Sequence, residues 1–271
     1  MDLSHDLIES DRAYFERGAR LVGLPGAVLA HMPTFRDIPA AAVVHRIDPG
    51  ALLPDPLTWI VTVETVVADL GLPRSRFFLD RSTPELELAL TMLGYQSRAE
   101  HGLIRPAAQT ESRVQLVPIG NDTDWSHKLG IHAPTENGPD GFALDPHRWV
   151  TFEQAKQAAG YFTLYLVKQD GVACGSVGVN CTGKLLRLKN LVVASAHRRR
   201  GVGAAILDAL ASMAHARGLA AVGCFSIPEG PGDAFYRGHG FREALVQVGW
   251  DRTLNLTVPA RLARRRVHAY S

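Results

Sequence analysis

The sequence has 271 residues, more than one domain usually needs, so we expect two domains or one enlarged α/β domain. Its 46% hydrophobic and 21% charged residues are ordinary for a globular protein and exclude disorder throughout the chain. Residues 1–110 carry 10 Arg or Lys and 14 Asp or Glu, whereas the remainder carries 19 and 13, which places any anionic ligand in the second part and is too mild to indicate nucleic acid.

The first residues lack the basic and apolar regions of a signal peptide, and no apolar run approaches the roughly 20 residues that span a bilayer. We therefore expect a cytoplasmic protein with no membrane partner. Cys174, Cys181 and Cys224 are an odd number without C-x-x-C spacing, which predicts reduced thiols. The 11 histidines show no ligand spacing, so we expect no metal.

The first part of the chain alternates between strand and helix patterns. We expect a helix over 7–20, strands over 26–32 and 40–47, a helix over 54–71, a strand over 76–80, a helix over 83–94 and a strand over 95–104. The helix over 54–71 is rich in β-branched residues, but its apolar residues share one helical face. Asp55 with Pro56 forms a good N-cap and first helical position, and Gly71 supplies the stop.

Residues 106–112 lack an apolar period and begin with Pro, which predicts a linker. Beyond it we expect a strand over 113–119, a loop with short helical pieces over 120–145, a helix over 151–159, a hairpin over 161–180 that turns at Asp170-Gly171, a strand over 184–194, a helix over 203–217, a strand over 219–227, a short helix over 233–239, a strand over 241–250 and a basic tail over 259–271.

The most specific motif is "RRRGVG", residues 198–203, between the strand over 184–194 and the helix over 203–217. N–H groups at a helix start lack intrahelical acceptors and carry the positive end of the helix dipole, so they can hold phosphate oxygens. The segment lacks the Gly-Lys-Ser/Thr of a P-loop and the third glycine of the dinucleotide-binding fingerprint. A different nucleotide loop is indicated.

This segment resembles the acyl-CoA motif of the GNAT acetyltransferase superfamily, which reads Arg or Gln, two residues, Gly, one residue, then Gly or Ala. The resemblance extends to an aliphatic strand at 191–193 and to "AFYRGHGF" at 234–241, a short helix that carries Tyr and ends in Gly-Phe. It covers residues 113–258 and implies an α/β (α+β) fold in which a mixed, mostly antiparallel central sheet is flanked by helices.

The resemblance implies acetyl-CoA as the acyl donor and direct transfer of its acetyl group. The backbone of the aliphatic strand would pair with pantetheine, the amides from Arg200 to Ala204 would hold the pyrophosphate, and Arg198 would lie beside it. Tyr236 matches a general acid that protonates the departing thiolate. The residues expected to bind the donor are Leu191, Val192, Val193, Arg198, Arg199, Arg200, Gly201, Val202, Gly203 and Ala204.

Three of these assignments have alternatives. Arg199 or Arg200 could be merely solvated, and Tyr236 could simply cover the core beside Phe235. The strand before the loop offers Arg187 and Lys189 where relatives often carry a catalytic glutamate. Among acidic residues of the loop that precedes Tyr236, Glu229 is the candidate base and Asp233 the other option, with a water relay as a further possibility.

The first part of the chain contains a weak internal repeat of the second. Gly94-Tyr95 aligns with Gly240-Phe241 and puts Leu90 where Tyr236 stands, while the turn over 46–55 lacks R-x-x-G-x-G. We expect tandem GNAT-like domains: a degenerate one over 1–105 without the cofactor motif, the linker over 106–112, an active one over 113–258 and the tail over 259–271.

The resulting functional hypothesis is an N-acetyltransferase that acts on a primary amine, with a small molecule favoured over a protein as acceptor. We expect a monomer or homodimer. A second hypothesis is an acyl-CoA sensor or scaffold without turnover, because the catalytic glutamate is missing. A third, nucleic-acid binding through the arginines, would show a steep salt dependence.

Overall fold

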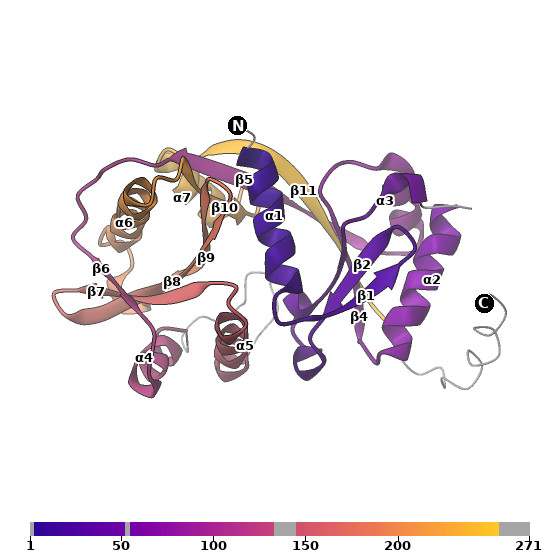
Figure 1. Cartoon of the computed structure of the whole chain (residues 1–271), viewed down its shortest axis with the longest axis horizontal. Coiled ribbons are helices and arrows are strands. Elements are labelled where there is room, and N and C mark those ends of the chain that lie inside the picture. The colour runs from indigo at the N-terminus through magenta and orange to yellow at the C-terminus, as the bar shows by residue number, and fades with distance from the viewer. Residues whose placement is uncertain (1–2, 52–54, 133–144, 255–271) are drawn as a thin grey trace. The chain divides into compact units, whose positions relative to one another are not determined.

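The computed structural model describes residues 3–51, 55–132 and 145–254, which form two compact units (Figure 1). The larger unit comprises Met1–Gly18 and Ala99–Gln247, and the smaller unit comprises Ala19–Arg98 and the chain from Val248 onward. This division differs from the domain boundaries expected around residues 105 and 113, because the N-terminal helix and residues 99–105 belong to the larger unit.

The smaller unit consists of a β-sheet and the two helices α2 and α3. Its elements are β1 (Arg20–Leu24), β2 (Ala27–His31), β3 (Ala42–His45), α2 (Pro56–Asp69), β4 (Arg74–Leu79), α3 (Pro84–Met92), the start of β5 (Gln96–Pro106) and the end of β11 (Arg242–Thr253). The strand order is β1-β2-β3-β4-β11, in which β3–β4 is parallel and β1–β2, β2–β3 and β4–β11 are antiparallel. The sequence analysis missed β1, which pairs with β2.

The α2 helix confirms the capping prediction. Its N-cap is Asp55, whose carboxylate accepts a hydrogen bond from the backbone N–H of Thr58 at 2.8 Å, and Pro56 is the first helical residue. The buried side chains of this helix, Trp59, Ile60, Val63 and Val67, belong to one core cluster with strand residues such as Phe77. Capping and period therefore outweigh the low helix propensity of its β-branched residues.

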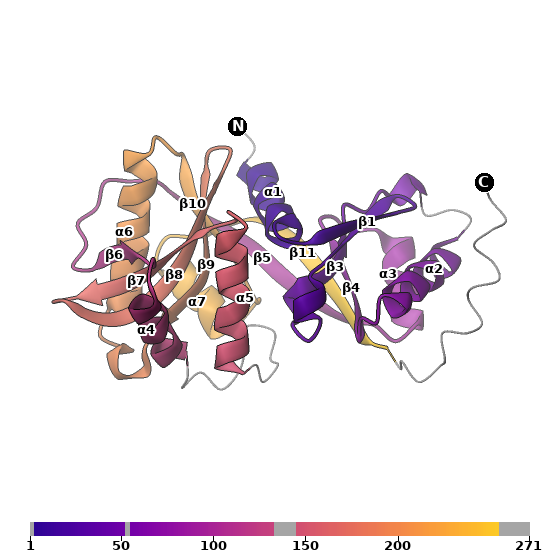
Figure 2. The same ribbon diagram turned by 60° about the horizontal axis from the view of Figure 1, so that its bottom comes forward.

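The larger unit contains a longer, mixed sheet (Figures 1 and 2). Its elements are α1 (Leu3–Glu16), β5, β6 (Gln115–Pro118), α4 (Asp122–His132), α5 (Pro146–Ala158), β7 (Thr163–Gln169), β8 (Val172–Thr182), β9 (Leu185–Val193), α6 (Val202–Ala216), β10 (Ala221–Ser226), α7 (Pro231–Gly238) and β11. The strand order is β11-β5-β10-β9-β8-β7-β6, in which β9–β10 is parallel and β5–β10, β6–β7, β7–β8 and β8–β9 are antiparallel.

Alternate residues of β9 face opposite layers of the larger unit. Leu186 and Leu188 are buried in the cluster that contains the apolar face of α6, whereas Leu185 is buried against Leu7 of α1. Arg187 shares the α1 side, because its guanidinium contacts Asp11 of that helix. The N-terminal helix therefore covers one face of the sheet that α6 covers from the other side.

Several expected elements are shifted in the structure. The helix expected over 7–20 spans Leu3–Glu16, and the helix expected over 151–159 begins at Pro146, where the Asp145 side chain caps it. The loop expected over 120–145 contains the 11-residue helix α4, while residues 133–144 and the basic tail over 259–271 lie outside the described residues. The hairpin at Asp170-Gly171 is confirmed, with φ angles of 51° and 80°.

The expected linker is anchored to α6. The Thr110 hydroxyl donates to the carbonyl of Asp208 at 2.7 Å, and the Ser112 hydroxyl donates to the carbonyl of Ala205 at 2.7 Å. Among the helices of the described residues, none is both long enough and apolar enough to cross a bilayer. The same residues contain no group of His, Cys, Asp and Glu that could hold a metal ion.

Candidate functional site

The loop between β9 and α6 leaves the start of α6 open. Gly201 is the N-cap, with a φ of 74° that favours glycine, and it supplies no side-chain cap. The N–H groups of Val202, Gly203 and Ala204 therefore have no intrahelical acceptor. A Cβ at Gly203 would lie 3.0 Å from the Phe235 ring, so this glycine allows α6 to pack closely on α7. The structure thus explains both glycines of the motif: Gly201 by its positive φ and Gly203 by the close approach of Phe235.

The side chains of Arg198 and Arg113 donate to backbone carbonyls at this loop, and the arginines over 198–200 are exposed. Nε of Arg198 donates to the carbonyl of Val193 at 3.1 Å, which turns its side chain back onto the end of β9. Arg199 has a φ of 58°, and the carbonyl of Arg200 accepts a hydrogen bond from the guanidinium of Arg113. Arg113 thus adds a cation at the loop that the sequence analysis did not identify, since it lies more than 80 residues away along the chain.

The corresponding helix of the smaller unit, α2, has a side-chain cap at its N-terminus. The Asp55 carboxylate accepts hydrogen bonds from both the backbone N–H and the hydroxyl of Thr58 at the start of α2. An anion of the protein therefore already occupies the N-terminal turn of α2, whereas the N-cap of α6 is a glycine. The two units differ in the group at this position.

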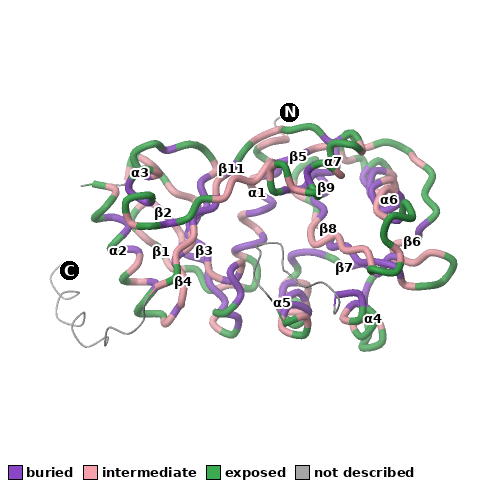
Figure 3. The backbone as a smooth tube through the Cα atoms, turned by 180° about the vertical axis from the view of Figure 1, so that it is seen from behind, coloured by how far each residue is buried: buried purple, intermediate pink, exposed green. Residues whose placement is uncertain are grey.

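Strands β9 and β10 separate just before the loop. Their parallel pairing covers Ala221↔Leu185, Val222↔Leu186 and Gly223↔Arg187, although β9 continues to Val193. Residues 185–188 are buried and residues 189–193 are partly exposed, as the change of colour along β9 shows (Figure 3). The backbone of residues 191–193 thus has an edge that β10 does not pair with.

A bulge in β9 lies at the same place. Gly178 pairs with Lys189 and Ser176 pairs with Val192, so the single residue Val177 faces both Asn190 and Leu191. Asn190 has a φ of 54°, a left-handed conformation that asparagine tolerates better than most residues. The bulge shifts Leu191 out of register with β8.

Glycines on β8 make room for this bulge. A Cβ at Gly175 would lie 2.6 Å from the carbonyl oxygen of Val192, and a Cβ at Gly178 would lie 3.0 Å from the Phe162 ring. A backbone oxygen that close cannot be moved cheaply. The sequence "GSVG" over 175–178 therefore permits the close approach of β8 and β9 around the bulge.

Tyr236 lies on α7 at the edge of the α6 core. Its ring centroid is 5.3 Å from those of Phe235 and Phe241, and the side chain packs against the main cluster of the larger unit. Burial raises the pKa of Tyr236 above its ordinary value, with the charge of Cys224 in the same direction. The phenol therefore keeps its proton at neutral pH, as a proton donor must.

The two acidic residues that precede Tyr236, Glu229 in a turn and Asp233 in the first turn of α7, differ in their surroundings. Glu229 is exposed, with a φ of 58°, in the turn between β10 and α7. Asp233 is buried and accepts hydrogen bonds from Ser226 and Arg237. Burial opposes its ionisation, but the hydrogen bonds from Arg237, His101 and Ser226 outweigh burial and lower the pKa of Asp233 to about 2. Asp233 is thus a structural carboxylate and a poor base.

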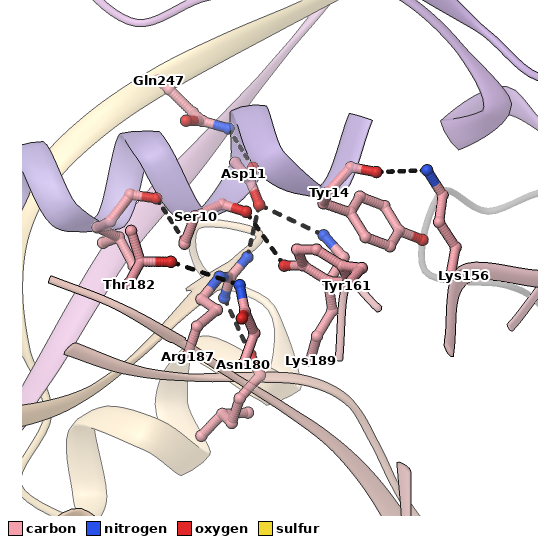
Figure 4. Close-up of polar contacts among 12 residues, drawn as sticks. Ser10, Asp11, Tyr14, Lys156, Tyr161, Asn180, Thr182, Arg187, Lys189 and Gln247 are labelled. Atoms are coloured by element: carbon pink, nitrogen blue, oxygen red, sulfur yellow. Dashed lines mark hydrogen bonds and ion pairs between the residues drawn. The ribbon is translucent and has the colours of Figure 1, made fainter. Parts of the chain in front are cut away.

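A carboxylate from α1, that of Asp11, faces two cations of β9, Arg187 and Lys189 (Figure 4). Asp11 accepts from Arg187 at 2.9 Å and from Gln247 at 3.0 Å, and the ammonium of Lys189 is 3.4 Å away. Burial alone would raise the pKa of Asp11, but Lys189 and Arg187 overcome it and lower that pKa to about 2. The sequence analysis missed Asp11, because 176 residues separate it from Arg187.

A fully buried lysine fixes the end of the same helix. Nζ of Lys156 donates to the carbonyls of Tyr14, Phe15 and Arg17, the last at 2.8 Å, where α1 ends. A cation at a helix C-terminus is favourable to the helix dipole. Burial, together with the charge of Lys189, lowers the pKa of Lys156 to about 7.

Comparisons with known proteins agree with this geometry. Residues 160–243, from the turn before β7 into β11, match the family model described as Acetyltransferase (GNAT) domain. No curated protein matches the sequence.

Solved structures share the fold across most of the chain. A GCN5-related N-acetyltransferase from Kribbella flavida has a TM-score of 0.61 and 13% identity, over 93% of this chain and 95% of that chain. A conserved protein of unknown function from Staphylococcus epidermidis ATCC 12228 has a TM-score of 0.62 and 13% identity, over 88% and 95%. A tandem GNAT protein from the clavulanic acid biosynthesis pathway has a TM-score of 0.57 and 12% identity, over 92% and 87%.

Proposed function

Since the chain carries a GNAT acetyltransferase domain within a tandem GNAT fold, we propose that it is an N-acetyltransferase that moves an acetyl group from acetyl-CoA to a primary amine of a small molecule. The observation that carries this proposal is the continuity of two features in the larger unit. The edge of β9 over 191–193, which β10 does not pair with, is joined by the loop over 194–201 to the uncapped start of α6. A long, anionic ligand with an amide-containing arm fits such an edge.

The residues of this region have the groups that acetyl-CoA requires. The backbone of Leu191–Val193 offers strand-like partners for pantetheine amides, and the amides from Arg200 to Ala204 offer donors for pyrophosphate oxygens. Arg113 and Arg198 add positive charge beside the loop. When bound there, acetyl-CoA supplies an activated acetyl thioester. A metal has no role in this proposal.

The proposed chemistry uses three kinds of group. The N–H of Leu191, next to the bulge, donates to the acyl carbonyl oxygen as negative charge develops there. Tyr236 is the proposed donor of a proton to the departing thiolate, since its phenol is protonated at neutral pH. Glu229 is the proposed base, either directly or through water, because Asp233, the other acidic candidate, lies in α7 and is held by hydrogen bonds.

The smaller unit is proposed to lack donor binding. The Asp55 carboxylate caps α2, so an incoming phosphate would meet negative charge where α6 offers N–H groups. The smaller unit therefore lacks both the R-x-x-G-x-G motif and, at α2, a free helix start, which is a physical reason for only one unit being active. The cytoplasmic location and the monomeric or homodimeric state also stay predictions.

The function is tested by thiol release from acetyl-CoA with a panel of amines, using the Tyr236→Phe variant. We expect the variant to lower kcat about 100-fold with the Kd for CoA unchanged, because only proton transfer is lost. Tyr165→Phe, a buried tyrosine in the same core cluster, is the control and should keep its kcat.

The possible results separate the hypotheses. Binding of CoA without turnover of any amine would favour the sensor or scaffold over the enzyme. A Tyr236→Phe variant with the wild-type kcat would remove the proposed acid but leave the acetyltransferase standing. Tight, steeply salt-dependent binding of DNA or RNA without binding of CoA would favour the third hypothesis.

A further inference from the structure

A buried polar cluster connects helices α4 and α5 with the bulge of β9. It consists of Lys128 and His132 on α4, Glu153 on α5, Ser176 on β8 and Asn190 on β9. The side chains of Lys128 and Glu153 are fully buried, and their charged atoms are 3.0 Å apart. No step of the proposed reaction uses these groups.

Three hydrogen bonds and one ion pair connect the members of the cluster. The ammonium of Lys128 contacts Oγ of Ser176 and Nε2 of His132, each at 3.1 Å, besides the Glu153 carboxylate. The other oxygen of Glu153 accepts from the side-chain amide of Asn190 at 2.8 Å. Both strands that flank the bulge are therefore connected to the Lys128–Glu153 pair, β8 through Ser176 and β9 through Asn190.

A buried charge pair such as Lys128–Glu153 is weak evidence for a role in stability alone. Removing two charges from water costs several kcal/mol per ion, and a well-packed apolar pair of similar volume is often equally stable or more so. Burial, together with the charge of Lys128, lowers the pKa of His132 to about 3, so this ring is neutral and accepts from the ammonium. Unlike apolar packing, the hydrogen bonds of this cluster fix the orientation of particular side chains, those of Asn190 and Ser176.

Asn190, whose side-chain amide Glu153 holds, is also a residue of the β9 bulge. Asn190 has its left-handed φ of 54° at the point where Leu191 leaves the register of β8. The orientation of the peptide between Asn190 and Leu191 sets the direction of the Leu191 N–H. Glu153 holds the Asn190 side chain, so it restricts the rotation of that peptide.

We infer that Asn190, Glu153 and Lys128 are positioning residues that hold the β9 bulge and aim the Leu191 N–H at the acyl carbonyl. This inference rests on the proposed function, and it adds a reason why helices α4 and α5 influence the acyl-transfer step without contacting the donor. A misplacement of about 1 Å at such a donor costs about 100-fold in rate.

The first test is Asn190→Gly. Glycine accepts a positive φ, so the bulge can still form, but its connection to Glu153 is lost. We expect kcat to fall about 10- to 100-fold with the Kd for CoA within twofold of wild type, because CoA has no acyl carbonyl. An acetyl-CoA analogue with a methylene group in place of the sulfur should bind more weakly, and the infrared band of its carbonyl should shift to higher frequency as the hydrogen bond weakens.

Asp170→Gly is the matched control. It replaces another residue with a positive φ, 51°, in the exposed turn between β7 and β8 of the same sheet. Its kcat, its Kd for the analogue and its carbonyl band should equal those of wild type. A merely structural role for Asn190 would lower the melting temperature without moving the carbonyl band.

The second test exchanges the polar groups. Asn190→Asp alone places two carboxylates together and should lose activity, whereas Asn190→Asp combined with Glu153→Gln restores one amide, one carboxylate and the original net charge. We expect the double variant to recover at least tenfold in kcat over the single variant, since an aimed donor is worth about 100-fold.

Failure of the inference differs from failure of the proposed function. If wild type binds neither CoA nor the analogue, the proposed function and the inference are both overturned. If wild type binds and turns over but Asn190→Gly keeps kcat, analogue affinity and carbonyl band, the inference alone is overturned. Failure of the double variant to exceed Asn190→Asp also contradicts it, provided that both are folded by circular dichroism.

Discussion

Replacing Asp11 by asparagine should destabilise the larger unit severely. The Asn side chain has nearly the same shape and can still accept from Arg187, but the negative charge that faces Arg187 and Lys189 is lost. The Arg187 side chain is 3% exposed, so its charge would be left without compensation inside the protein. The perturbation is therefore electrostatic, with little change in packing.

The size of the effect follows from two independent magnitudes. Lowering the pKa of Asp11 from 3.8 to about 2 corresponds to about 2 kcal/mol of stability at neutral pH. Breaking a buried ion pair by removing one partner costs about 3–5 kcal/mol, because a buried charge stays unpaired. We expect the free energy of unfolding of the larger unit to fall by at least about 3 kcal/mol.

Hydrogen exchange measured by mass spectrometry reports on this unit by itself. Peptides over 3–16 and 185–193 should exchange through openings whose free energy falls by the stated amount in Asp11→Asn. Glu9→Gln is the matched control on the same helix, since its carboxylate pairs with Arg12 in a partly exposed contact. That variant should change the free energy by less than about 1 kcal/mol.

The acid dependence has a defined sign. The folded pKa of Asp11 lies below 3.8, so its contribution is present above about pH 4 and is lost as the pH falls from 3.8 toward 2. Asp233 has a similarly lowered pKa in the same unit, so Asp11→Asn should reduce this acid sensitivity and leave part of it. An Asp11→Asn variant as stable as Glu9→Gln at pH 7 would refute the electrostatic account of this cluster.

Two other substitutions probe the end of α1 and the phosphate loop. Between pH 7 and 10.5 the unfolded chain binds more protons at Lys156 than the folded chain, so the free energy of unfolding rises with pH. Lys156→Met should flatten this rise, as measured by hydrogen exchange at pH 7 and 9.5. An unchanged slope would contradict the lowered pKa of Lys156. Arg113→Ala should weaken CoA binding about fivefold in calorimetry without changing kcat, since one hydrogen bond to the carbonyl of Arg200 is worth about 1 kcal/mol. Arg105→Ala, whose guanidinium pairs with Asp208 of α6, should leave CoA binding unchanged, and equal effects of the two variants would argue against a specific role for Arg113.

The sequence predicted those features whose cause lies within a few residues. Asp55 and Pro56 start α2, and Asp170-Gly171 turns the β7–β8 hairpin, because capping and turn conformations depend on local backbone chemistry. The motif over 198–203 likewise predicted an open helix start, and Gly201 has the positive φ that the loop requires. Local signals are weaker for β1 and α4, because their apolar patterns are short: the sequence predicts no strand over β1, and only short helical pieces within a loop over α4.

Only the tertiary structure joined groups that are distant along the chain. Asp11 meets Arg187 across 176 residues, and α1 thereby belongs to the unit that carries the proposed donor site rather than to the segment that follows it. Glu153 reaches Asn190 across 37 residues. Sequence periodicity shows that a residue faces a covered side of its own strand or helix, but it does not show which element covers that side. Charge compensation in a buried layer depends on that second element, so the partners of Arg187 and Asn190 became visible only when the layers were assembled.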